Sequence, residues 1–149
     1  MSTYAFEDFP VGQVREFGAR QVTKEEVLAF AAAFDPQPFH LDEAAAEASV
    51  LRGLSASGWH TCAMVMRMMC DEYLIDSTSQ GSPGIDNLRW LSPVRPGDTL
   101  RVRMTVQEAR VSNSRPHIGL VRSEWAVFNQ HNVQVMSMEG WGMFGRRTV

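Results

Sequence analysis

Residues 58–74 read GWHTCAMVMRMMCDEYL, and this stretch decides the fold. From Trp59 to Leu74 the segment is apolar on nearly all sides when it is drawn as a helix. A helix without a polar face has to be covered on most sides by other parts of the protein. We therefore expect this segment to be the central helix of the domain, with the rest of the chain wrapped around it.

The second half of the chain supplies a suitable wrapper. Its segments alternate polar and apolar residues or favour β-forming residues, and turn-like stretches such as Pro96-Gly97-Asp98 separate them. A sheet wrapped around one buried helix makes the fold class α+β. We expect the following segments to be consecutive strands of one antiparallel sheet: residues 85–91, 100–111, 118–128 and 133–144.

The N-terminal part predicts an edge strand followed by a helix. Residues 6–22 contain a turn at Pro10-Val11-Gly12 and then a mixed polar and apolar stretch that suits an edge strand. Thr23 is a suitable N-cap, and Glu26 completes the pattern of a capping box. Apolar residues then recur at helical spacing, which predicts a helix over about residues 24–34.

Two prolines follow this helix and predict a stiff, extended segment. Pro36 and Pro38 each disfavour helical geometry at the residue before them. Residues 35–39 should therefore be extended. A second short helix is expected over residues 42–48.

Length and charge restrict the class of protein. The chain has 149 residues, of which 44% are hydrophobic, and this fits one domain over residues 1–149 with a substantial core. The formal net charge is −3 and the sequence pI is about 5.8, so the overall field repels nucleic acid and anionic membranes. We therefore expect neither nucleic acid nor membrane as a partner.

The cysteines and the N-terminal residues indicate where the protein works. Cys62 and Cys70 fall in the same predicted helix, so their Cα atoms should lie ~12 Å apart. A disulfide needs less than ~7 Å between these atoms. Residues 1–10 do not resemble a signal peptide, and no uncharged apolar run reaches membrane-spanning length. A cytoplasmic protein without a disulfide is the expectation.

The most informative chemistry lies in Phe34-Asp35-Pro36-Gln37-Pro38-Phe39-His40-Leu41-Asp42. An acid and an imidazole stand five residues apart there, and two prolines restrict the backbone between them. A carboxylate and an imidazole that face each other can hold a water, with one group taking a proton and the other donating one. The structural alternative is that Asp35 caps the preceding turn and His40 is an ordinary hydrogen-bonded histidine.

This segment resembles the Asp-x-Asn-Pro-x-His signature of the R-specific enoyl-CoA hydratases within the MaoC-like group. Asp35, Pro38 and His40 stand at the matching positions. Residues 40–46 resemble the continuation of that signature, and residues 91–100, LSPVRPGDTL, resemble a later Pro-Val-x-Pro-Gly-Asp-Thr-Leu segment of the family. The resemblance covers most of the chain.

The resemblance implies a hotdog fold, which is a bent antiparallel sheet around one long helix. It also implies that Asp35 and His40 activate water for addition to a trans-2-enoyl thioester, giving the 3R-hydroxyacyl product, or catalyse the reverse dehydration. Gly58 matches a family glycine whose backbone N–H polarises the thioester carbonyl at the start of the central helix.

The resemblance further implies the partners of the protein. The substrate would be an acyl-CoA of fatty acid metabolism, and neither a cofactor nor a metal is expected. Hotdog sheets usually pair edge to edge, because an exposed strand edge otherwise invites uncontrolled pairing. We therefore expect a homodimer or a larger even homo-oligomer.

The chain departs from the family pattern at two places. Gln37 stands where the signature has asparagine. Around Gly58, the family has a histidine before the glycine and a small or aliphatic residue after it, whereas this chain has Ser57 before it and Trp59-His60 after it. Both places adjoin the expected site.

Other functions on the same fold stay open at this point. Thioester hydrolysis would leave Asp35 and His40 idle and would use Asp71 or Glu72 at the end of the central helix. Non-catalytic binding of an acyl thioester would be favoured if the pair were incomplete, but both members are present. The sequence therefore favours hydration first, hydrolysis second and binding third.

Other reactive or adaptable side chains lie on the same helix. No cluster of ligating residues surrounds His60, so a hydrogen-bonded histidine is favoured over a metal ligand shared with His40. The apolar setting of Cys62 should raise its pKa and favours packing over nucleophilic chemistry. Four methionines either fill the core, which is the commoner use, or line an acyl tunnel: Met64, Met66, Met68 and Met69.

Overall fold

An antiparallel sheet forms the body of the protein in the computed structural model, which describes residues 2–148. Within these residues the strands follow the order β1-β3-β4-β5-β2 across one sheet. The strands are β1 (Val14–Gln21), β2 (Ile85–Trp90), β3 (Thr99–Val111), β4 (Ile118–Phe128) and β5 (Gln134–Gly145).

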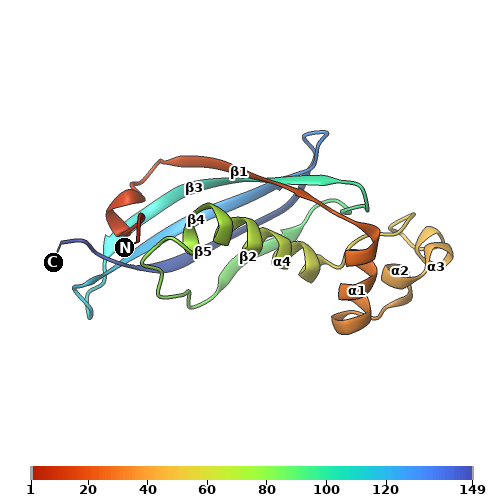
Figure 1. The fold of residues 1–149 in the computed structure, drawn as a ribbon, viewed down its shortest axis with the longest axis horizontal. Coiled ribbons are helices and arrows are strands. Elements are labelled where there is room, and N and C mark those ends of the chain that lie inside the picture. The colour runs from red at the N-terminus through yellow and green to blue at the C-terminus, as the bar shows by residue number, and fades with distance from the viewer. Residues whose placement is uncertain (1, 149) are drawn as a thin grey trace.

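Helix α4 (Gly58–Met69) lies along one face of this sheet, and the helices formed by residues 24–47 gather beyond one end of it (Figure 1). α4 continues into a wider helical turn, so the helical segment ends at Leu74 as predicted. The expected α+β fold with one central helix is confirmed. The other helical elements are η1 (Phe6–Asp8), α1 (Lys24–Phe34), α2 (Pro38–Leu41), α3 (Glu43–Glu47) and η2 (Cys70–Leu74).

The cover over α4 is one-sided. Met64 and Val65 are buried, whereas Trp59 and Met66 are 59% and 47% exposed. Because the sheet bends around one side of the helix, apolar side chains on the other side face solvent in the single chain. This differs from the expectation that most sides of the helix would be covered.

The expected run of consecutive strands is correct for β3, β4 and β5 and wrong for β2. β2 pairs with β5, where Ile85 lies opposite Gly140 and Trp90 lies opposite Met136. The position beside β3 is taken by β1 from the N-terminal part of the chain. β2 therefore pairs with the edge of β5 that β4 does not occupy. As a result, β1 and β2 form opposite edges of the sheet.

Helix α1 begins and ends where the sequence predicts. The Thr23 hydroxyl accepts a hydrogen bond from the Glu26 N–H at 3.2 Å. The capping box is incomplete, however, because the Glu26 carboxylate pairs with Arg20 at 3.0 Å instead of turning back to the helix start. The strand before this helix is an edge strand, as expected.

The proline segment is less extended than predicted. Asp35 and Gln37 have non-helical backbone angles, but Pro38 is the first residue of α2. Proline suits this position because a first helical residue has no intrahelical partner for its N–H. The second short helix follows as predicted, and the Asp42 carboxylate caps it by accepting from the Ala45 N–H at 2.9 Å.

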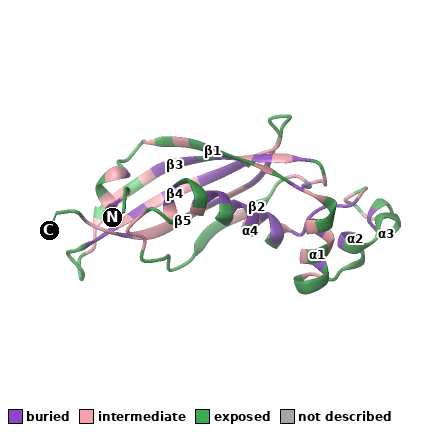
Figure 2. Cartoon of the chain, viewed as in Figure 1, coloured by how far each residue is buried: buried purple, intermediate pink, exposed green. Residues whose placement is uncertain are grey.

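The core lies between α4 and the sheet (Figure 2). Phe9 and Tyr73 are almost fully buried there, and the Trp125 indole donates a hydrogen bond to the Tyr73 hydroxyl at 3.2 Å. Figure 2 also shows that α1, α2 and α3 carry much more exposed surface than the middle strands. Cys62 and Cys70 are free thiols. In residues 2–148, no helix has the length and apolar character needed to cross a bilayer.

Candidate active site

Asp35 lies where α1 ends, and His40 lies in the short helix that follows. The Asp35 N–H donates to the Ala31 carbonyl at 2.9 Å, and Pro36 disfavours any continuation of the helix. Pro38 then begins α2, which brings His40 back toward the end of α1. His40 Nε2 lies 3.4 Å from Asp35 Oδ2. The structure thus brings together the two residues that the sequence singled out.

The imidazole of His40 is held in one orientation. Its Nδ1 lies 2.8 Å from the Ser55 carbonyl oxygen. Because a carbonyl oxygen only accepts hydrogen bonds, Nδ1 carries a hydrogen, and Nε2 is the ring nitrogen that faces Asp35. Only 8% of the His40 side chain and 16% of the Asp35 side chain are exposed. Bulk water therefore competes little for these contacts.

Hydrogen bonds keep the Asp35 carboxylate charged. The Gln37 side-chain amide donates to Asp35 Oδ1 at 2.6 Å, and this bond is the main reason that the pKa of Asp35 lies below its ordinary value. The Ser57 hydroxyl lowers the pKa of Asp35 further, while burial acts in the opposite direction. Gln37, which replaces the asparagine of the signature, therefore contacts the acid directly.

Ser57 connects the pair to the start of α4. Its hydroxyl accepts a hydrogen bond from the Trp59 N–H at 3.3 Å, and it lies near enough to Asp35 to lower the pKa of that carboxyl. Gly58 is the first residue of the helix, and its N–H has no acceptor within residues 2–148. A helix N-terminus carries partial positive charge and unpaired N–H groups. This N–H is therefore suited to bind an oxyanion.

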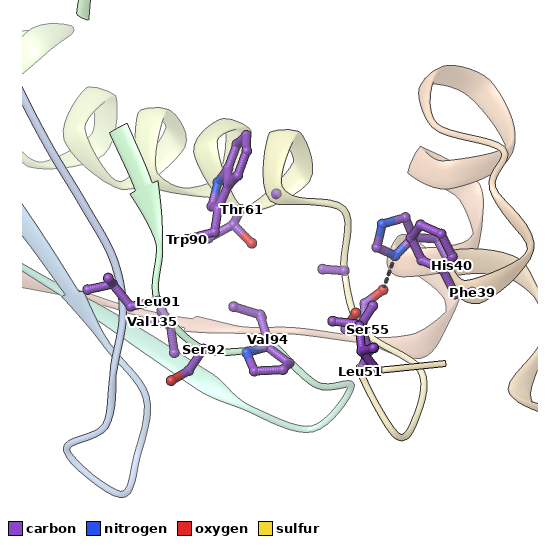
Figure 3. Close-up of a pocket in the computed structure, with 14 residues that line it drawn as sticks. Phe39, His40, Leu51, Ser55, Thr61, Trp90, Leu91, Ser92, Val94 and Val135 are labelled. Carbon is purple, nitrogen blue, oxygen red and sulfur yellow. Dashed lines mark hydrogen bonds between the residues drawn. The ribbon is translucent and has the colours of Figure 1, made fainter. Parts of the chain in front are cut away.

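A cavity of about 460 Å³ opens between the start of α4 and His40. Figure 3 shows His40 and Ser55 on one side of this cavity and Trp90 on the opposite side. The lining is mainly apolar and includes Leu91 and Val135. The volume lies within the ~300–1,000 Å³ that small-molecule sites usually occupy. We call this space the catalytic cavity.

Trp90 lies directly against Gly58. A Cβ atom at Gly58 would come within 2.4–2.7 Å of three atoms of the Trp90 indole. Trp59 packs edge to face on the same indole, with 5.1 Å between ring centroids. A side chain at position 58 would therefore have to displace this aromatic ring, a contact that the sequence did not predict.

The LSPVRPGDTL segment holds the loop that positions Ser55. The Arg95 guanidinium donates hydrogen bonds to the carbonyl oxygens of Gly53 at 2.7 Å and Leu54 at 3.2 Å. The Asp98 carboxylate in turn accepts from the Arg95 N–H at 2.9 Å. This segment therefore contributes to the site by fixing the loop whose carbonyl orients His40.

The carboxylates considered for hydrolysis lie elsewhere. Asp71 and Glu72 are exposed at the far end of α4, and neither lines the catalytic cavity. Asp71 forms an ion pair with Arg67 at 3.1 Å. The structure does not bring these carboxylates to the Asp35–His40 pair.

The other candidate side chains also lie outside the site. The His60 ring stacks on Phe30 with 4.8 Å between centroids, and burial lowers the pKa of His60. Burial raises the pKa of the Cys62 thiol, as the sequence indicated. Of the four methionines of α4, none lines the catalytic cavity, and three are buried in the core: Met64, Met68 and Met69.

Sequence reasoning missed part of this arrangement. Ser57 is the N-cap of α4, and serine before an apolar helix is a local signal for this position, but its proximity to Asp35 has no such signal. Ser55 acts through its backbone carbonyl, which leaves no signal in the residue type. Trp90 is distant from Gly58 in sequence, and only the packing of β2 beside α4 brings them together.

Comparison with known proteins identifies relatives. Residues 7–124 match the family model of the MaoC-like domain. The crystal structure of the MaoC-like dehydratase from Rhodospirillum rubrum has a TM-score of 0.89 and 37% identity, over 98% of this chain and 99% of that one. The unliganded R-hydratase PhaJ1 from Pseudomonas aeruginosa has a TM-score of 0.77 and 28% identity, over 96% of this chain and 86% of that one.

A third structure defines the fold. Rv0216 from Mycobacterium tuberculosis, described as a double hotdog fold, has a TM-score of 0.82 at 18% identity, over 97% of this chain and 45% of that one. This similarity concerns the fold alone, and the smaller share agrees with one of two hotdog units. The bent sheet around α4 is therefore a hotdog fold. With the family match spanning residues 7–124, the chain belongs to the MaoC-like domain family.

Proposed function

We propose that the protein is a hydro-lyase that adds water to a trans-2-enoyl thioester of coenzyme A and, in reverse, dehydrates the 3R-hydroxyacyl thioester. The observation that carries this proposal is the 3.4 Å contact between His40 Nε2 and Asp35 Oδ2 beside the N-terminus of α4. An acid–base pair next to unpaired N–H donors supplies both proton transfer and stabilisation of negative charge. Similarity to a structure named as an R-hydratase supports the same function.

The pair activates a water molecule. A water held between Asp35 Oδ2 and His40 Nε2 gives a proton to Nε2, whose lone pair is free because Nδ1 is bonded to Ser55. The water oxygen adds to the β-carbon, and the Asp35 carboxylate stabilises the imidazolium that forms. Nε2 then returns the proton to the α-carbon. One whole water is added and the enzyme is unchanged.

The start of α4 stabilises the intermediate. When the water oxygen attacks the β-carbon, the electrons of the double bond move onto the thioester carbonyl and give an enolate. The Gly58 N–H is fixed by the helix before the reaction begins, so it can bind the enolate oxygen without reorganisation. Thus Gly58 acts through its backbone, while Asp35 and His40 act through their side chains.

Turnover of crotonyl-CoA tests the proposed function. The full chain should consume the enoyl absorbance and give the 3R-hydroxy product by chiral chromatography. Asp71→Asn is the matched control for Asp35→Asn and should keep this activity, because the Asp71 carboxylate lies outside the catalytic cavity. Absence of hydration with enoyl-CoA substrates of any length, or a 3S product, contradicts the proposal. Release of free CoA thiol would indicate hydrolysis instead.

We also propose that two copies pair through the β2 edge. β2 ends the sheet, and its Ile85 and Trp90 are 47% and 46% exposed in the single chain. An unpaired edge with exposed apolar side chains is a template for another strand. Light scattering at micromolar concentration should find a dimer or a larger even assembly, and a monomer would contradict this proposal.

A further inference from the structure

A second cavity follows the catalytic cavity along the same layer of the protein. It has a volume of about 240 Å³, and apolar side chains of α4, β2 and β5 line it, among them Met66, Ile85 and Met138. The catalytic cavity is lined by earlier residues of α4 and by the opposite end of β2, including Thr61 and Trp90. We call the second space the apolar cavity.

Cys62 and Met136 line neither cavity, and each lies in the sequence between a residue that lines the catalytic cavity and one that lines the apolar cavity. Trp90 lies at the edge of the catalytic cavity beside them. Trp90 and Met136 are paired across β2 and β5, and Cys62 Sγ lies 3.9 Å from Met136 Sδ. Burial raises the pKa of the Cys62 thiol and the Trp90 side chain lowers it, in agreement with an indole that lies near the sulfur. Cys62 lies on α4 between Thr61 of the catalytic cavity and Met66 of the apolar cavity. We interpret Trp90, Cys62 and Met136 as the partition between the two cavities.

Trp90 is the largest member of this partition and the one that lies against the start of α4. Its indole covers Gly58 so closely that a Cβ there would lie 2.4 Å from the ring. Its outer face is exposed, and Trp59, a half-exposed neighbour, is its aromatic contact. An acyl chain that runs from the Gly58 N–H along α4 therefore meets the indole before it reaches the apolar cavity.

We propose that Trp90 determines the acyl-chain length that the protein accepts, by closing the catalytic cavity against the apolar cavity. This inference rests on the proposed function for the class of substrate. With Trp90 in place, short linear acyl groups fit. Removing the indole joins the two cavities and admits longer chains. The apolar lining of the second cavity suits such a chain because it offers carbon contacts without unpaired polar groups.

The test compares Trp90→Ala and Trp90→Phe with Trp59→Ala, which removes an aromatic ring that lines neither cavity. For each variant, kcat/KM is measured with crotonyl-, 2-hexenoyl- and 2-octenoyl-CoA. One methylene in an apolar pocket changes selectivity ~10–200-fold. Trp90→Ala should therefore raise the octenoyl-to-crotonyl ratio at least ~10-fold. Trp90→Phe should give a smaller rise, and Trp59→Ala, which removes only the ring that packs on Trp90, should give a rise well below that of Trp90→Ala.

Binding of saturated acyl-CoA separates this inference from the proposed function. Calorimetry with butyryl- and octanoyl-CoA reports the same selectivity without turnover. If no variant hydrates an enoyl-CoA but Trp90→Ala still shifts binding toward octanoyl-CoA, the length limit stands and the hydratase proposal falls. An unchanged ratio in both Trp90 variants, or an equal shift in Trp59→Ala, overturns the role of Trp90. Trp90→Phe keeps the test valid if Trp90→Ala does not fold.

Discussion

The two ends of α4 border cavities of opposite character. At the N-terminal end, the catalytic cavity is lined by His40, Ser55 and the first residue of the helix, Gly58. At the C-terminal end, the apolar cavity is lined by methionine and aromatic side chains such as Met104 and Trp125. The N-terminal end of α4 therefore borders polar groups that hydrogen bonds hold in place. Its C-terminal end borders apolar side chains that packing holds in place.

This difference shows how a small domain separates function from stability. The N-terminal end lies beside α1, α2 and α3, which are largely exposed and add little to the core (Figure 2). The C-terminal end lies over the buried middle of the sheet. Substitutions at the N-terminal end should therefore change activity more than stability, and substitutions at the C-terminal end should do the reverse.

The largest expected effect is at the catalytic pair. Asp35→Asn and His40→Ala should each lower kcat/KM for crotonyl-CoA at least ~100-fold, because a positioned acid or base usually contributes that much. Both variants should stay folded by circular dichroism, because they lie outside the core cluster. Near-normal turnover in either variant would remove the pair from the mechanism.

The next largest effect is expected at the apolar cavity, which borders the C-terminal end of α4. Met104 is 2% exposed and lines the apolar cavity. Met104→Ala should lower the free energy of unfolding by ~2–5 kcal/mol, as for other large-to-small core substitutions. The kcat/KM of the folded protein should stay near that of the wild type. Met66→Ala is the exposed control and should cost much less stability. If Met104→Ala lost activity but not stability, it would contradict the claim that the two ends of α4 serve activity and stability separately.

A third prediction separates packing from oxyanion binding at Gly58. Gly58→Ala keeps the backbone N–H but places a Cβ 2.4 Å from Trp90. Displacing the indole should lower kcat/KM for crotonyl-CoA and cost up to ~1–3 kcal/mol of stability through overpacking. The double variant Gly58→Ala/Trp90→Ala should recover both, because the added methyl then has room. If the double variant stays as impaired as Gly58→Ala alone, the close indole is not the reason for the glycine.

The smallest expected effect is a shift in the titration of Asp35. The Gln37 amide is the main group that lowers the pKa of Asp35. In Gln37→Ala this carboxyl should therefore have a higher pKa and lose its charge at a higher pH. In a carbon-13 NMR titration the midpoint of the Asp35 carboxyl should move toward neutral pH in Gln37→Ala, while Gln37→Asn should move it less. A midpoint that moves toward lower pH, or does not move, would show that Gln37 does not support the charged carboxylate.

The sequence predicted the regular parts of the molecule well. The helical spacing after Thr23, the long apolar helix and three consecutive strands all have local patterns, and the structure has each of them. The place of β2 could not be predicted in this way, because it depends on which sheet edge β1 leaves free. Local patterns determine the elements, whereas competition for edges determines their order.

The sequence predicted the two side chains of the candidate site but not the groups that hold them in place. Asp35 and His40 come from one short segment, so sequence alone could bring them together. The groups that orient them come from other parts of the chain: the Ser55 carbonyl and the Ser57 hydroxyl. A backbone carbonyl has no signature in residue type, and such contacts follow only from the folded path of the loop.

One measurement tests the central claim most directly, which is that chemistry occurs at the N-terminal end of α4. It is a crystal structure of Asp35→Asn with crotonyl-CoA bound. We predict the thioester carbonyl oxygen within hydrogen-bond distance of the Gly58 N–H, and the β-carbon next to His40 Nε2. A carbonyl oxygen more than ~3.5 Å from every backbone N–H of residues 57–61 would contradict this. So would an acyl group seated in the apolar cavity with its thioester remote from His40.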